Sequence, residues 1–176
     1  MEIDILKYPV GKVVKPEVYT DQYRAGAIKI IEDLPSQLKK VLSNVDGPKL
    51  TARYRPEGWT IQQVVHHLAD SHINSFVRFK LALTENNPTI KPYEEKLWAE
   101  MIDANDSNIE DSIQIISGIH ARWVKLMRNM SSSDWDKSFQ HPEGNRTISL
   151  NFALTIYEWH CRHHLQHIVN AINNGF

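Results

Sequence analysis

The sequence has one cysteine, no long apolar run and almost no net charge. Because Cys161 is the only cysteine among 176 residues, an internal disulfide is excluded and a reducing compartment is favoured. No apolar run approaches the roughly 20 residues that a membrane-spanning helix needs. The first residues, MEIDILKYPVGK, also lack the apolar core of a signal peptide. We therefore expect a cytoplasmic protein with no membrane partner.

The charges balance closely, with 20 lysines and arginines against 21 aspartates and glutamates. A domain that binds nucleic acid normally carries a basic face, so we expect no nucleic-acid partner. With 41% hydrophobic and 23% charged residues, the composition is typical of a folded globular protein. The length suits one domain with a substantial core, and we expect residues 1–176 to form a single domain.

The first helical pattern follows an extended lead-in over residues 1 to about 19. From Asp21 to Val45, apolar residues recur every three or four positions, which indicates one buried face of a helix. Pro35 interrupts this pattern and predicts a kink or break near Leu34. The motif NVDGPKL then ends the helix, since glycine and proline are stop signals.

Capping patterns mark the starts of three further helices. TIQQ at 60–63 is a capping box that opens a helix running to about Leu83, and SNIE at 107–110 is a second box that opens another. Ser149 caps a last helix, which ends near Gly175.

The connections between these helices are longer than a simple turn. YEEKLWAEM predicts a short helix inside the connection that follows the second long helix. A turn around Gly144 predicts a small hairpin before the last helix. The sequence therefore predicts an all-α fold, a four-helix bundle with longer crossover connections.

Histidine is absent before residue 66 and is then concentrated in two short segments, VVHHLADSH and WHCRHHLQHI. In the second segment, His160 and His164 lie four residues apart on the inward face of the predicted helix. Their Cβ atoms are then about 6 Å apart, so both rings can reach one ion. A lone inward histidine is usually a core residue with one hydrogen-bond partner. Several are harder to explain without a metal, because each unpaired buried nitrogen costs about 1–3 kcal/mol.

The first segment offers the third ligand. We choose His67 over His66, because Asp70 follows one turn later and is a candidate to orient the His67 ring. His66 and His72 lie on other sides of the predicted helix. Three imidazoles leave a fourth coordination position open, which is the pattern of catalytic zinc sites. We expect one divalent ion per chain, with zinc or nickel preferred among the metals that imidazole suits.

Other residues are weaker candidates for the site. Asp70 and Glu158 are the available general bases, and His167 lies one turn beyond His164, where it would line the pocket. His163 is as readily a surface residue as a partner of a ligand, and Cys161 points about 100° away from its neighbouring ligand. Tyr93 and Trp98 are candidates to roof a pocket, and Arg55 and Arg78 are candidates to hold an anionic substrate.

The stretches GWTIQQVVHHLADSH and YEWHCRHHLQHI together resemble the DinB superfamily of four-helix-bundle metalloproteins. The resemblance is strongest to its YfiT-like group, described as metal-dependent hydrolases, and it extends over nearly the whole chain through YRPEGWT, NSFVRFKLALTE and IKPYEEKLWAEM. Carried over position by position, it implies that His67, His160 and His164 are the metal ligands. It also implies a homodimer, and relatives include enzymes that transfer low-molecular-weight thiols such as bacillithiol and mycothiol.

Two catalytic functions are compatible with such a site. An ion with three neutral ligands keeps its full charge, which favours ionisation of a bound water near pH 7. The same open position can bind and deprotonate a thiol. We predict a metal-dependent hydrolase with a small-molecule substrate. A bacillithiol-type thiol S-transferase is the first alternative, and a non-catalytic metal-binding bundle is the second.

Overall fold

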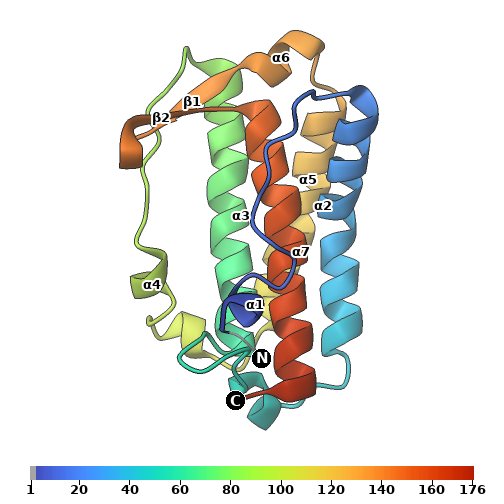
Figure 1. The fold of residues 1–176 in the computed structure, drawn as a ribbon, viewed down its shortest axis with the longest axis vertical. Coiled ribbons are helices and arrows are strands. Elements are labelled where there is room, and N and C mark those ends of the chain that lie inside the picture. Colours follow the sequence, from blue (N-terminus) through green and yellow to red (C-terminus); the bar gives the residue numbers. More distant parts are fainter. Residues whose placement is uncertain (1–2) are drawn as a thin grey trace.

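The computed structural model describes residues 3–176, and four long helices make up most of it. These helices are α2 (Asp21–Leu42), α3 (Ile61–Thr84), α5 (Glu110–Arg128) and α7 (Leu150–Asn174). They stand side by side in Figure 1, and both α2 and α3 pack against α5 and α7. The predicted four-helix bundle is confirmed. None of the helices between residues 3 and 176 is long and apolar enough to cross a membrane.

The predicted caps are correct at two of the three helices. Thr60 Oγ1 accepts a hydrogen bond from the Gln63 N–H at 3.3 Å, and Gln63 Oε1 accepts one from the Thr60 N–H at 3.0 Å. Ser149 Oγ accepts from the N–H of Phe152 at 3.2 Å. The predicted box at 107–110 is wrong, because α5 begins only at Glu110 and its N-cap residue makes no side-chain cap.

The N-terminal lead-in and the first long helix also differ from expectation. A short helix, α1 (Ile3–Lys7), lies inside the segment that was predicted to be extended. The side chain of Leu6 is buried, so this helix packs against the rest of the protein. Of the kink or break predicted near Leu34, the break does not occur, since α2 continues through Pro35. Proline has no N–H for the carbonyl of Ile31, and His120 Nδ1 from α5 donates to this carbonyl instead.

The hairpin and the short connecting helix are both present. Strands β1 (Ser138–His141) and β2 (Arg146–Ser149) pair antiparallel around a turn in which Gly144 has a φ of +71°. The N–H of Ile90 donates to the carbonyl of Gln140 at 3.0 Å, so the hairpin holds the connection that follows α3. Helix α4 (Glu95–Trp98) lies within that connection (Figure 1).

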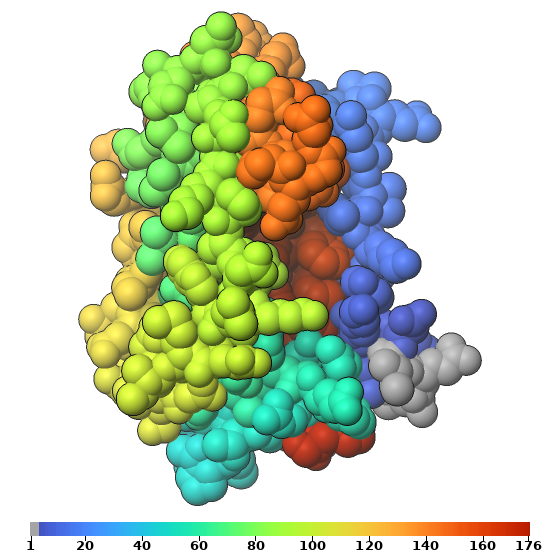
Figure 2. Space-filling view, turned by 90° about the vertical axis from the view of Figure 1, so that its left-hand side faces the viewer, coloured from blue at the N-terminus to red at the C-terminus, as the bar shows by residue number. Residues whose placement is uncertain are grey.

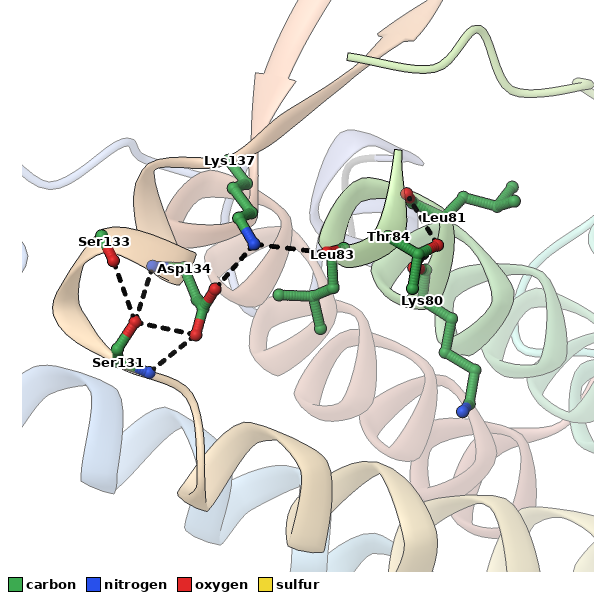
Figure 3. A network of polar contacts seen from close by, with 8 residues as sticks. All are labelled: Lys80, Leu81, Leu83, Thr84, Ser131, Ser133, Asp134 and Lys137. Carbon is green, nitrogen blue, oxygen red and sulfur yellow. Dashed lines mark hydrogen bonds and ion pairs between the residues drawn. The ribbon is translucent and has the colours of Figure 1, made fainter. Parts of the chain in front are cut away.

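Helix α6 (Ser132–Asp136) lies at one end of the bundle (Figure 1), and Figure 3 shows the polar contacts around it. Asp134 Oδ2 accepts a hydrogen bond from the N–H of Ser131 at 3.0 Å, and Ser131 Oγ accepts from the Asp134 N–H at 3.2 Å. Lys137 Nζ lies 2.8 Å from Asp134 and donates to the carbonyl of Leu83 at 3.2 Å. These contacts join α6 to the last turn of α3.

Candidate metal centre

Three histidines on two helices bring ring nitrogens together inside the bundle. His67 comes from α3, and His160 and His164 come from α7. One nitrogen of each ring lies within 4.8 Å of the others. The Nε2 atoms of His67 and His160 are 3.2 Å apart. Two ligands on one tetrahedral zinc ion, with bonds near 2.0–2.1 Å, stand about 3.3 Å apart. The spacing therefore fits a shared ion.

The electrostatic environment keeps these rings neutral. Burial lowers the pKa of His67 from 6.5 to about 4. Burial also lowers the pKa values of His160 and His164 well below the usual value, and the neighbouring imidazoles add to this effect. Neutral imidazole is the form that binds a metal, so the site needs no deprotonation near pH 7.

A hollow in the surface exposes part of α7, the helix that carries two of the three histidines (Figure 2). Figure 2 shows deep-red atoms of the C-terminal helix at the bottom of a depression. The depression is framed by the yellow-green connection that carries α4, the orange hairpin and the blue N-terminal segment. His160 is partly exposed, whereas His67 and His164 are buried. Trp59 packs on His67, with ring centroids 4.7 Å apart, and shields that ligand from solvent.

A second group of histidines also meets the distance requirement for a metal. It consists of His163, His164 and His167, so it shares His164 with the first group. His167 already uses both ring nitrogens, because Nε2 lies 3.3 Å from the carbonyl of Lys7 and Nδ1 lies 3.4 Å from Nδ1 of His164. His163 stacks on Trp159 at a centroid distance of 4.2 Å. The first group is therefore the better candidate.

His66 and Asp70 lie on a different side of α3 from His67. His66 is satisfied by Ser112 Oγ at 2.8 Å and by the carbonyl of Asp106 at 3.0 Å. Asp70 follows His66 by one full turn and lines the same small cavity of about 210 Å³. The structure therefore does not bring Asp70 to His67, and no hydrogen bond joins the two side chains within residues 3–176.

Asp70→Asn is expected to stabilise the protein at pH 7 and to have no effect near pH 4. Burial and the nearby Asp103 raise the pKa of Asp70 from 3.8 to about 6. The folded state thus holds this proton more tightly than the unfolded state does, and stability is lost as the pH rises through this window. We expect a gain of roughly 1 kcal/mol for this partly exposed group. Urea unfolding at both pH values measures it, and equal effects at the two would contradict the assignment.

Two histidines at the site were not identified from the sequence pattern. His72 was placed on another side of its helix, yet it is fully buried and its Nε2 lies 3.0 Å from Nδ1 of His160. His72 Nδ1 in turn lies 2.6 Å from Nε2 of His120 on α5. The available signal was His120 itself, a polar residue within the apolar stripe between Ile116 and Trp123.

The weaker candidates have separate fates. Glu158 forms a bidentate ion pair with Arg162, with N–O distances of 2.8 and 3.0 Å. Its carboxylate is therefore not free to act as a general base at the ligands. Cys161 is buried, and burial raises the pKa of its thiol. Tyr93 packs on Trp98, with ring centroids 4.4 Å apart. Tyr93 lines a cavity of about 370 Å³ with Arg78, and Arg55 lines another of about 530 Å³ with Trp59.

Comparison with known proteins identifies relatives over almost the full chain. Residues 30–168 match the family model of the DinB superfamily. A Bacillus cereus protein named "putative metal-dependent hydrolase" is 44% identical over 165 residues, which are 94% of each chain. A protein with the same description from Oceanobacillus iheyensis is 45% identical over 164 residues, 93% of this chain and 94% of the relative.

Solved structures agree with the sequence relatives. YfiT from Bacillus subtilis, described as "a probable metal-dependent hydrolase with an unusual four-helix bundle topology", has a TM-score of 0.93 at 38% identity and covers 96% of this chain and 97% of its own. A mycothiol-dependent maleylpyruvate isomerase has a TM-score of 0.63 at 19% identity, covers 84% of this chain and 60% of its own, and shows a likeness of fold alone. The predicted family is confirmed, and this chain belongs to the DinB superfamily.

Proposed function

We propose that this protein is an enzyme, a metal-dependent hydrolase whose divalent ion is held by His67, His160 and His164. The observation that carries this proposal is the convergence of three neutral imidazoles, two of them with Nε2 atoms 3.2 Å apart. The names of relatives that are 44–45% identical support the same function. We propose about one ion per chain, zinc or nickel, since imidazole suits both metals.

The donor set suits hydrolysis because none of its members is charged. An ion held by three neutral ligands keeps its charge and a free coordination position, which lowers the pKa of water toward about 7 and supplies a nucleophile. The chain itself fixes the rings and limits the access of bulk water. Trp59 covers His67, and Tyr157 packs beside His160 with ring centroids 5.6 Å apart.

A small polar molecule fits the surroundings of the site best. Charged side chains of both signs line the cavities of about 370 and 530 Å³, with Arg78 among glutamates in the first and Arg55 beside Arg53 in the second. The hydroxyl of Tyr93 is buried in the first of these regions and has no hydrogen-bond partner among the described residues. A substrate that reaches this hydroxyl would satisfy it.

Thiol transfer of the bacillithiol type is the second candidate, because the same open position would bind and deprotonate a thiol. The mycothiol-dependent isomerase shares only the fold with this chain. Cys161 is not the reacting thiol, since its side chain is buried and burial disfavours the thiolate. The thiol would therefore come from the substrate.

The two reactions are separated by one pair of assays on protein purified without a histidine tag and loaded with zinc. A panel of esters and amides without added thiol is expected to contain a hydrolysed substrate, and His67→Ala should abolish that turnover. Turnover only when a low-molecular-weight thiol and an electrophile are supplied together would overturn hydrolysis in favour of transfer. No turnover in either assay, with zinc bound, would indicate a metal-binding bundle.

A further inference from the structure

We propose that two chains of hydrogen-bonded imidazoles, each ending on a main-chain carbonyl, fix which ring nitrogen His160 and His164 present to the metal. The first chain passes through His72 and His120 to the carbonyl that Pro35 leaves free. The second chain passes through His167 to the short N-terminal helix. This inference rests on the proposed function only in assigning the metal ligands.

The first chain runs across three helices. His160 Nδ1 lies 3.0 Å from His72 Nε2, and His72 Nδ1 lies 2.6 Å from His120 Nε2. His120 Nδ1 meets the carbonyl of Ile31 in α2. His72 and His120 are buried, and no acidic side chain within residues 3–176 is hydrogen-bonded to them, so a charged ring there would be uncompensated and each ring carries one proton.

The carbonyl of Ile31 at the end of this chain fixes which ring donates and which accepts in each hydrogen bond. A carbonyl oxygen only accepts, so the proton of His120 is on Nδ1 and its Nε2 is an acceptor. His72 must then donate from Nδ1, which leaves its Nε2 to accept from His160 Nδ1. As a result, His160 Nε2 carries a lone pair, and this is the atom 3.2 Å from His67 Nε2.

Pro35 is the origin of this direction. In an uninterrupted α-helix, the carbonyl of Ile31 would accept from the N–H four residues later. Residue 35 is proline and has no N–H to give. The carbonyl is therefore free to accept from His120. Pro35 and His120 both line one cavity between α2 and α5. The proline that the sequence pattern treats as a helix breaker thus acts on the site through His120.

The second chain gives the same result for the other ligand on α7. His167 Nε2 lies 3.3 Å from the carbonyl of Lys7, so this nitrogen is the donor. His167 Nδ1 is then an acceptor and lies 3.4 Å from His164 Nδ1. His164 donates from Nδ1 and keeps its Nε2 lone pair for the metal. His72, His120 and His167 are positioning residues, because they act on the ion through His160 and His164.

Long-range ¹H–¹⁵N spectra of the metal-free protein test this directly, because they report which imidazole nitrogen carries the proton. His72, His120, His160 and His164 are expected to be protonated on Nδ1, and His167 on Nε2. A proton on Nε2 of His160 or His164 would overturn the proposal for that chain. These spectra need no bound ion, so they separate this inference from the proposed function. If the spectra are as expected but the protein binds no zinc, only the proposed function is refuted.

His120→Phe keeps an aromatic ring in the core and removes the acceptor of His72. The His160 signals are expected to show a mixture of tautomers, whereas those of His164 and His167 stay unchanged because their chain is separate. A general loosening of the fold would alter both. Zinc affinity, measured against a chromophoric chelator, should fall about 10- to 100-fold. Unchanged His160 signals and affinity would overturn the role of the first chain.

Pro35→Ala tests the same chain without removing a core side chain. The restored N–H at position 35 would compete for the carbonyl of Ile31 and weaken the hydrogen bond from His120. The ¹H chemical shift of the His120 Nδ1 proton should therefore decrease. Ser36→Ala is the matched control, because Ser36 is exposed and its hydroxyl donates to the carbonyl of Asp33 in its own helix. An identical His120 signal in wild type and Pro35→Ala would overturn the role given to the proline. This variant also carries the test if His120→Phe does not fold.

Discussion

His160→Ala is expected to lower zinc affinity by well over 100-fold and to abolish any zinc-dependent activity. Loss of an outer hydrogen-bond partner alone costs about 10- to 100-fold in metal affinity, and this change removes a ligand. It leaves His67 and His164 as the only two ligands of the proposed set. Competition with a chromophoric chelator measures the affinity directly.

His66→Ala is the matched control for this loss. His66 is buried like His67 and His164 and is next to His67, but its two ring nitrogens are bonded to Ser112 and to the carbonyl of Asp106. This variant should lose some stability and keep its zinc. If His66→Ala loses zinc while His160→Ala retains it, the ligand assignment is wrong.

The metal-free protein is expected to lose most of its stability between about pH 6.5 and pH 4. Burial lowers the pKa from 6.5 to about 4 for His67, His120 and His163, and to about 3 for His167. The unfolded chain binds protons on these rings first. Their contribution is therefore complete above pH 6.5 and is lost as the pH falls toward 4.

The size of this effect follows from the number of rings. Lowering the pKa from 6.5 to about 4 corresponds to roughly 3 kcal/mol for one buried histidine. Four such contributions together are of the same size as the typical total stability of a domain, about 5–15 kcal/mol. Urea midpoints at half-unit steps of pH measure the loss. A midpoint that stays constant from pH 6.5 to pH 4.5 would show that these rings are not held neutral by the fold.

The bundle could be predicted because its local signals agree with its packing. The Thr60 and Ser149 caps start their helices where the apolar period begins, and Gly144 occupies the turn with positive φ. The errors arose where tertiary contacts override local preference. Pro35 lacks the N–H that would bond the carbonyl of Ile31, and His120 from another helix donates to this carbonyl instead, so α2 continues through the proline.

The candidate ligands could be chosen from spacing, but their partners could not. The i, i+4 spacing of His160 and His164, together with their place on the apolar stripe of the helix, selects this pair. The contact between His72 and His120 joins α3 to α5, and no periodicity in one helix predicts which residue of another it meets. Asp70 was chosen for the same local reason, and the structure places it beside His66 instead.

The metal content of protein purified without a histidine tag tests the central claim most directly, with His67→Ala and His163→Ala compared side by side. These two variants separate the two histidine groups that meet the distance requirement. The account predicts about one divalent ion per chain in wild type and in His163→Ala, and almost none in His67→Ala. Retention of the ion in His67→Ala, with its loss in His163→Ala, would contradict it.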